Sequence, residues 1–272
     1  MYFLSFGDWG ENTIIKKLIY DLIVQKSPDA IISLGDNFYD FGIQSEHDPL
    51  LKLQYEYYFP KIPFYAILGN HDYLGNTYAQ LVYAQLNPSW IMPYRYYDRG
   101  YPDVHLIAID TFDLAKTESF KNSICMGMNL VTYNHIQQTL TYDSQMKWIE
   151  QVLSTSRSKW KIVFGHYPIF SNGSHGNTDE LVDSLLPLLK KYKVHLYLSG
   201  HDHNLCHRES DGVHCIVSGT GCRSTPIINK KEFTPLSEIT GSAYVRTSME
   251  TLEFGFYNLN GDTIFQKIIS TS

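Results

Sequence analysis

Short apolar segments alternate with helix-like segments over the first two hundred residues of the chain. Apolar runs bounded by glycine, such as "YFLSFG", are typical of buried strands. Between some of these runs, apolar residues recur at helical spacing, which predicts helices over 14–23, 143–155 and 178–192. Strands separated by helices indicate parallel pairing through crossover connections. The strands predicted in this part lie at residues 2–7, 30–35, 63–69, 104–110, 161–165 and 194–200.

The pattern changes after residue 205, where strand-like runs follow one another through short turns. The dipeptide Asn260-Gly261 between two such runs is a strong hairpin signal. We therefore expect a second, mostly antiparallel sheet beside the first. The predicted fold class is α/β, a two-layer β-sandwich of mixed sheets flanked by helices, and residues 1–272 are expected to form one domain. The runs concerned are "GVHCIVSG", "SAYVRTS", "TLEFGFYNL" and "DTIFQKIIS".

Residues 111–142 form the least regular stretch of the chain. A loop of this length inside a compact domain is usually functional or mobile. We predict an irregular loop at about 111–142 that covers a site, with a surface insertion as the alternative.

Charge and hydropathy limit the classes of partner. The formal net charge of −6 disfavours a general affinity for nucleic acid or for an anionic membrane. No apolar run approaches transmembrane length, and "MYFLSFGDWG" enters a strand-like run at once, so we expect neither a transmembrane segment nor a signal peptide. An anionic small substrate would need local positive charge, such as a metal ion.

The chain has four cysteines, and none of them has metal-ligand spacing such as CxxC. The stretch "CHRESDGVHC" reads as two strands around a four-residue loop, "ESDG". That loop would put Cys206 opposite Cys215, close enough for a cross-strand disulfide. Two free buried thiols are the alternative. The other cysteines are Cys125 and Cys222.

Five predicted strands end in glycine followed by a polar residue that can bind a metal ion. In open α/β sheets ligands bind beyond the carboxyl ends of the strands, so these side chains are expected to converge. One such residue is usually a turn former, whereas five in order indicate a metal site. A lone histidine inside a strand, such as His105 or His195, is expected to be structural. The five segments "GDWG", "GDNFY", "GNHD", "GHYP" and "GHDHN" supply the candidate ligands Asp8, Asp36, Tyr39, Asn70, His166, His201 and His203.

The candidate ligands combine oxygen and nitrogen donors without sulfur. Carboxylate and phenolate favour Fe(III), whereas imidazole and amide oxygen suit Fe(II), Zn(II) or Mn(II). Seven ligands are too many for one six-coordinate ion with open positions, but one carboxylate that bridges two ions accounts for all of them. Two neighbouring metal ions suit the hydrolysis of phosphate esters, because they activate water and bind the attacking and leaving oxygens.

The five segments resemble the motifs of the binuclear metallophosphoesterases, and Tyr39, three residues after Asp36, resembles the tyrosine of the purple acid phosphatases. The stretches "GNHDYLGNTYAQLVY", "SNGSHG" and "DGVHCIVSGTG" are similar to the small, mammalian-type tartrate-resistant acid phosphatases. This resemblance covers essentially the whole chain. It implies Fe(III) bound by Asp8, Asp36, Tyr39 and His203, and a divalent ion, Fe(II), Zn(II) or Mn(II), bound by Asp36, Asn70, His166 and His201, with Asp36 bridging.

The resemblance also implies the activity, an acid phosphatase that hydrolyses phosphate monoesters by attack of a metal-bound hydroxide. His71 would contact the substrate and help protonate the leaving group, and His175 would be a second outer histidine near the phosphate. Tyr73 and Tyr167 are expected in the pocket wall. We expect a monomer in the secretory pathway, in a lysosome-like compartment or outside the cell. The alternative is a catalytically reduced phosphatase-like scaffold or membrane-anchor protein, because domains of this kind also serve as structural anchors.

Overall fold

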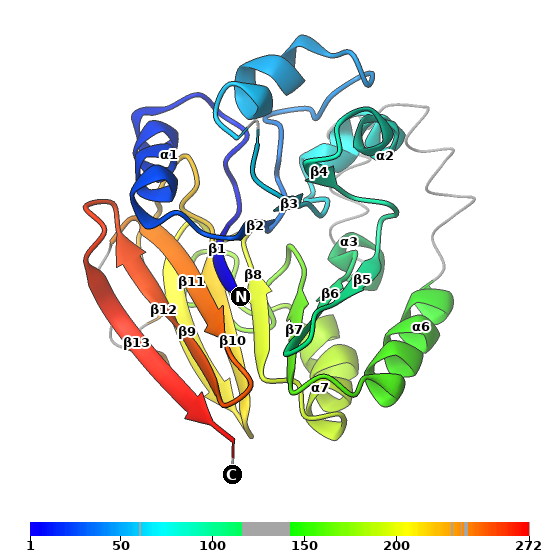
Figure 1. Ribbon diagram of the computed structural model, residues 1–272, viewed down its shortest axis with the longest axis vertical. Coiled ribbons are helices and arrows are strands. Elements are labelled where there is room, and N and C mark those ends of the chain that lie inside the picture. Colours follow the sequence, from blue (N-terminus) through cyan, green and yellow to red (C-terminus); the bar gives the residue numbers. More distant parts are fainter. Residues whose placement is uncertain (60, 116–141, 230, 235, 237–238, 272) are drawn as a thin grey trace.

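Two mixed β-sheets packed against each other form the centre of the molecule (Figure 1). The computed structural model describes residues 1–59, 61–115, 142–229, 231–234, 236 and 239–271. The seven-stranded sheet has the order β13-β12-β11-β1-β2-β3-β4. Its strands are β1 (Tyr2–Phe6), β2 (Ala30–Ser33), β3 (Phe64–Tyr65), β4 (Trp90–Ile91), β11 (Gly241–Thr247), β12 (Thr251–Asn258) and β13 (Thr263–Ser270).

The second sheet has six strands in the order β5-β6-β7-β8-β10-β9. Helix α1 (Ile14–Lys26) lies beside the first sheet, and the helices α6 (Tyr142–Thr155) and α7 (Leu186–Lys191) lie beside the second (Figure 1). The predicted sandwich of two mixed sheets with flanking helices is therefore confirmed. The strands of the second sheet are β5 (Tyr97–Gly100), β6 (Val104–Ala108), β7 (Trp160–Phe164), β8 (Leu196–Ser199), β9 (Leu205–Ser210) and β10 (Val213–Ser218).

The assignment of strands to sheets differs from the prediction. The parallel strands do not form one sheet, because β1, β2 and β3 pair in the first sheet whereas β6, β7 and β8 pair in the second. The expectation of a separate antiparallel sheet is wrong, since β11 adds to β1 and β10 adds to β8. Apolar periodicity identifies a strand but not its partner. Pairs such as Phe3 with Val245 are decided by packing between segments far apart in the chain.

The predicted helices are present at α1, at α6, and at a helical segment composed of η3 (Leu181–Leu185) and α7. The Thr13 hydroxyl caps α1 by accepting a hydrogen bond from the backbone N–H of Lys16. Among the described residues, the helical segments that the periodicity did not identify are η1 (Leu51–Glu56), η2 (Asp72–Leu74), α2 (Thr77–Leu86) and α3 (Thr111–Leu114).

Helix α3 occupies the start of the stretch that we predicted to be irregular. A carboxylate oxygen of Asp110 caps this short helix by accepting a hydrogen bond from the backbone N–H of Phe112, at 3.2 Å. Residues 111–114, at the start of that stretch, are therefore helical rather than irregular. The prediction of a covering loop falls on residues 116–141, which lie outside the described residues.

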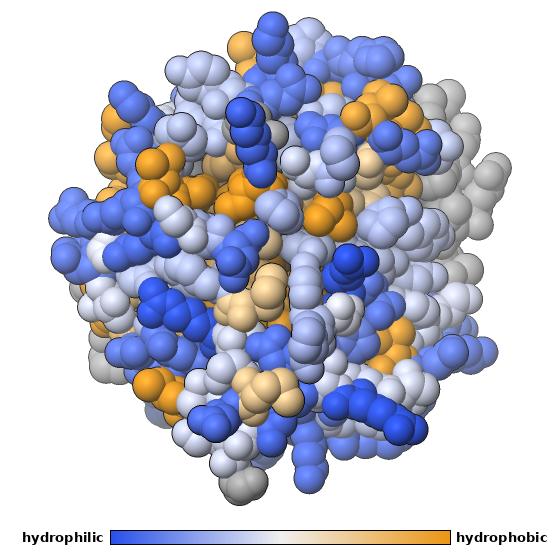
Figure 2. All heavy atoms as spheres, in the orientation of Figure 1, coloured by the Kyte–Doolittle hydropathy of each residue, from blue (hydrophilic) through white to orange (hydrophobic). Residues whose placement is uncertain are grey.

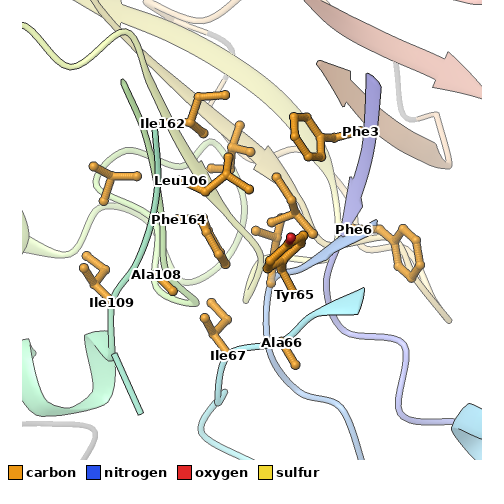
Figure 3. Close-up of a cluster of buried hydrophobic side chains, with 14 of the residues drawn as sticks. Phe3, Phe6, Tyr65, Ala66, Ile67, Leu106, Ala108, Ile109, Ile162 and Phe164 are labelled. Carbon is orange, nitrogen blue, oxygen red and sulfur yellow. The ribbon is translucent and has the colours of Figure 1, made fainter. Parts of the chain in front are cut away.

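The core between the sheets is built from their facing side chains (Figure 3). Phe3 of β1 and Ile67, which follows β3, lie on one side, and Leu106 of β6 and Phe164 of β7 lie on the other. All four are at most 1% exposed, and burial of such side chains contributes roughly 1.5–3 kcal/mol each. This packing fixes the position of one sheet relative to the other, and with it the position of their carboxyl ends.

The hairpin of β9 and β10 overturns the predicted disulfide. A two-residue turn joins the strands, with positive φ angles of 50° at Asp211 and 85° at Gly212. In this register Cys206 lies opposite Val217, and Cys215 lies opposite Arg208. The two cysteines are diagonal neighbours, at a separation that exceeds the usual span of a disulfide. Both are buried free thiols, as is Cys222, whereas Cys125 lies outside the described residues.

Polar side chains cover most of the face shown in Figure 2, and apolar side chains form small groups between them. Within the described ranges, no helix combines the length and the apolar character needed to cross a bilayer.

Acid is expected to destabilise the fold through three buried or half-buried histidines. Burial lowers the pKa of His195, His207 and His214 to about 4 each, and the Nε2 atom of His207 lies 3.0 Å from the Nδ1 atom of His214. Unfolded histidines titrate near the ordinary value of about 6.5, so the unfolded chain binds more protons than the folded chain between these two values. Stability is therefore complete above about pH 6.5 and falls towards pH 4.

Chemical denaturation at pH 7 and at pH 5 measures this loss. The variant His207→Gln is expected to lose less stability between these pH values than the wild type, because it removes one of the groups. His47→Gln is the matched control, since the side chain of His47 is 79% exposed. Equal losses in the wild type and His207→Gln would contradict the prediction.

Candidate metal centre

The carboxyl ends of five strands bring the candidate ligands to one edge of the sandwich. Asp8 and Asp36 follow β1 and β2 in the first sheet, and His166 and His201 follow β7 and β8 in the second. Three of these residues have positive φ angles, 60° at Asp8, 53° at Asp36 and 70° at His201. Left-handed backbone is uncommon for residues other than glycine, and such positions cluster at functional sites.

One group of ligand atoms lies around the hydroxyl of Tyr39. This hydroxyl is 3.2 Å from Asp8 Oδ1 and 3.2 Å from His203 Nε2. The same two atoms of Asp8 and His203 are 3.5 Å apart. A phenol, a carboxylate and an imidazole thus point at one common position.

A second group lies around the side-chain oxygen of Asn70. Its Oδ1 atom is 3.0 Å from His166 Nε2 and 3.0 Å from His201 Nδ1. His166 Nε2 is also 3.5 Å from Asp36 Oδ1. An amide oxygen, two imidazoles and a carboxylate therefore point at a second position.

Asp36 connects the two groups, because it also interacts with the hydroxyl of Tyr39. Single ligand atoms of Asp8, Asp36 and His166 all lie within 4.8 Å of one another. Ligands bound about 2.1 Å from a metal ion at right angles are about 3 Å apart, which matches the separations within each group. The side chains therefore fit a pair of metal ions with Asp36 between them.

Hydrogen bonds on the far side of His166 favour metal binding. Its Nδ1 atom lies 2.7 Å from the carbonyl oxygen of Leu34, so Nδ1–H donates to that carbonyl. Nε2 then carries a lone pair that faces Asn70 and Asp36. This arrangement, with one ring nitrogen bound to backbone, is the usual support of a metal-binding histidine.

Burial and charge favour the binding of cations at this site. Burial, followed by the charges of Asp36 and Asp8, raises the pKa of Tyr39 well above its ordinary value. Burial, followed by the neighbouring His166, lowers the pKa of His201 well below its ordinary value. The site therefore holds two enclosed carboxylates without a protonated histidine at position 201, and bound cations would compensate their charge.

Asp72 supports the site without belonging to either group of ligand atoms. Its carboxylate accepts hydrogen bonds from the backbone N–H of Gly69 at 2.8 Å, from the backbone N–H of Asn37 at 3.1 Å, and from the side chain of Gln80 at 2.8 Å. Burial, followed by the charge of Asp36, raises the pKa of Asp72 to about 7. Asp72 thus connects the loop that carries Asp36 to the loop that carries Asn70.

A second support comes from Thr111, which we did not identify from the sequence. Its hydroxyl accepts hydrogen bonds from the backbone N–H groups of His166 at 3.1 Å and Tyr167 at 2.9 Å. The preceding residue, Asp110, forms a buried ion pair of 2.5 Å with Arg95. No motif or spacing marks Thr111, because its role arises from two segments that are distant in sequence.

The two outer histidines both lie next to candidate ligands. The ring of His71 is 4.6 Å from the ring of Tyr39, and its backbone N–H donates to Asp36 Oδ1 at 2.9 Å. The ring of His175 is 4.3 Å from that of His201. Both histidines thus border the groups of ligand atoms rather than lying elsewhere on the surface.

The two tyrosines expected in the pocket wall occupy different environments. The ring of Tyr167 lies 4.5 Å from that of His201, next to the candidate ligands. Tyr73 is fully buried, stacked on Phe112 and hydrogen-bonded to Asp110, so its assignment to the wall is wrong. Its neighbours in sequence reach the site, but its own side chain points into the core.

The chain is similar to a family of phosphoesterases and to several acid phosphatases. Residues 1–205 match the calcineurin-like phosphoesterase family. Purple acid phosphatase 17 of Arabidopsis thaliana is 32% identical, over 98% of this chain and 84% of that protein. Tartrate-resistant acid phosphatase type 5 of Homo sapiens is 29% identical, over 97% of this chain and 89% of that protein.

Solved structures share the fold. The GAP50 anchor in the inner membrane complex of Plasmodium has a TM-score of 0.82 and 26% identity, over 100% of this chain and 89% of that chain. The purple acid phosphatase of yellow lupin seeds has a TM-score of 0.71 and 16% identity, over 99% of this chain and 53% of that chain. The family match and the relatives agree with the strand-end motifs. The chain therefore belongs to the calcineurin-like phosphoesterases, in the group of purple and tartrate-resistant acid phosphatases.

Proposed function

We propose that the protein is an acid phosphatase that hydrolyses phosphate monoesters at a pair of metal ions, one Fe(III) and one divalent. The observation that carries this proposal is the division of the candidate ligands into two groups that share Asp36. Two bound metal ions would supply an activated water and a positive environment for the phosphate.

The two groups differ in the ions they suit. Tyr39, Asp8 and His203 combine a phenol and a carboxylate with an imidazole, which favours a hard trivalent ion. Asn70, His166 and His201 combine neutral donors, which suit a divalent ion. This division is the basis for proposing Fe(III) at the first position and Fe(II), Zn(II) or Mn(II) at the second.

The outer histidines are proposed to act on the substrate. The Nδ1 atom of His71 lies 2.7 Å from the carbonyl oxygen of Asp40, so Nδ1–H donates to that carbonyl and the Nε2 edge is available to the leaving group. The backbone N–H of His175 donates to Asp202 Oδ1 at 3.1 Å, which holds this residue beside His201. Imidazole N–H groups at these positions would donate hydrogen bonds to the phosphate and provide the proton that the leaving oxygen takes.

Metal analysis combined with a visible spectrum tests the proposal. We expect two metal ions per chain, at least one of them iron, and a visible absorption band from a phenolate bound to Fe(III). Tyr39→Phe should abolish this band, because it removes the phenol oxygen. Tyr192→Phe is the matched control, since its hydroxyl contacts Glu150. Zinc alone in a colourless protein would contradict the ferric assignment, and a band that survives in Tyr39→Phe would contradict Tyr39 as the ligand of Fe(III).

A structural anchor is the second candidate function, and the likeness to the GAP50 anchor favours it. An anchor has no need for an intact set of metal ligands, whereas all seven candidate positions hold suitable donors here. Hydrolysis of an aryl phosphate at acidic pH distinguishes the two functions. Absence of both turnover and bound metal would favour the anchor.

A further inference from the structure

Arg223 lies at the edge of the candidate metal centre. Its guanidinium carbon is 4.9 Å from the centre of the Tyr39 ring, so it lies beside the ring whose hydroxyl belongs to the first group of ligand atoms. Its charge also acts on His203, the other candidate ligand beside Tyr39. The side chain of Arg223 is 44% exposed, which leaves its guanidinium accessible from solvent.

The backbone that carries Arg223 is attached to both sides of the site. The N–H of Gly221 donates to the carbonyl of Gly7 at 3.0 Å, directly before the ligand Asp8. The N–H of Thr225 donates to the carbonyl of the ligand His203 at 2.8 Å. Arg223 lies between these two attachment points, so its position is tied to that of the ligands.

The guanidinium of Arg223 has more N–H donors than its contact with Glu11 uses. Arginine carries five N–H groups in a planar fork. Glu11 accepts from Nη2, and the side chain also contacts Cys222. Glu11 is itself 47% exposed, so this ion pair lies in solvent and is weak. An incoming oxyanion can therefore bind the guanidinium beside Glu11 or in its place.

Space is available along the same segment. A cavity of about 190 Å³ borders His203 and the residues that follow Arg223, Ser224 and Thr225. The cavity therefore provides open space beside His203, next to the segment that carries Arg223.

We propose that Arg223 is a specificity-determining residue that binds a second oxyanion of the substrate, so that the preferred phosphate monoester carries a carboxylate or a second phosphate near its ester. This inference rests on the proposed phosphatase function. The formal net charge of −6 would repel such substrates at long range, and Arg223 provides the local charge that offsets this repulsion.

Matched aryl phosphates test the proposal. The three esters are 3-carbamoylphenyl phosphate, which is neutral at the second position, 3-carboxyphenyl phosphate and 1,3-phenylene bisphosphate. We expect kcat/KM to be higher for at least one of the two anionic esters than for the carbamoyl ester. The ester with the larger increase in kcat/KM shows whether the second group is a carboxylate or a phosphate. Arg223→Gln should lower this preference about tenfold, as expected for the loss of one charge-assisted contact, and Arg223→Lys should retain part of it.

Binding of the corresponding non-hydrolysable arylphosphonates, measured by calorimetry, should show the same loss in Arg223→Gln without any turnover. Arg157→Gln is the matched control, because Arg157 is exposed before β7, away from the carboxyl ends of the strands. If the wild type hydrolyses the esters but Arg223→Gln shows the same preference for the anionic esters over the carbamoyl ester, the inference fails and the proposed function stands. Loss of metal or of the visible band in Arg223→Gln would also overturn the inference, because Arg223 would then support Tyr39. If the wild type hydrolyses none of the esters, both fail.

Discussion

Asp36→Asn is expected to lower the turnover of an aryl phosphate by about a thousandfold or more, which corresponds to a loss of about 4 kcal/mol of transition-state stabilisation. Asparagine preserves the size of the side chain and tolerates the left-handed backbone at φ 53°. It removes a carboxylate that interacts with both groups of ligand atoms, through Tyr39 and through His166. Metal content should fall below two ions per chain, because each position loses a charged ligand.

Asp211→Asn is the matched control for this experiment. Asp211 has a similar backbone angle, φ 50°, but it lies in the turn between β9 and β10 with its side chain 80% exposed. The same substitution there should leave turnover and metal content unchanged. Turnover near the wild-type value in Asp36→Asn, in a sample with verified metal content, would refute the assignment of Asp36 as the shared ligand.

Gly69→Ala is expected to reduce turnover at least a hundredfold although it changes no ligand. A methyl group on Gly69 would overlap the Asp36 carboxylate and the backbone nitrogen of Asp36. Asp36 is 2% exposed and enclosed by its neighbours, so the overlap must displace its carboxylate from the shared position. Displacements of about 1 Å at a reacting centre cost about a hundredfold in rate, and overpacking costs about 1–3 kcal/mol of stability.

Gly100→Ala provides the comparison, because a methyl group on Gly100 would meet no atom within 4 Å. Turnover, metal content and the denaturation midpoint should be unaffected in this variant. Equal behaviour of Gly69→Ala and Gly100→Ala would show that the approach of Gly69 to Asp36 has no effect on the site.

The strand-end motifs made the candidate site predictable from the sequence. Each motif places a donor directly after a buried strand, and the carboxyl ends of parallel strands meet at one edge. The convergence of Asp8, Asp36 and His166 follows from this local pattern, although β7 proved to belong to a different sheet from β1 and β2. The side chains converge in spite of that error because the sandwich aligns the carboxyl ends of both sheets.

Other features depended on contacts that no local pattern encodes. The register of β9 and β10 depends on whether the connecting turn has two residues or four, and only the two-residue turn puts Cys206 opposite Val217. Thr111 reaches the backbone of His166 across fifty-five positions of sequence. Arg223 reaches the ring of Tyr39 from a segment that contains none of the recognised motifs.

The amino-acid sequence by itself determined the strand ends, the candidate metal ligands and the phosphoesterase family, because all three are encoded by short runs of neighbouring residues. Only the tertiary structure decided which strands share a sheet, how the ligands divide into two groups around Tyr39 and Asn70, and which charged side chain lies beside them. The physical reason is that pairing and packing join residues far apart in the chain, and their geometry depends on the whole core rather than on any one segment.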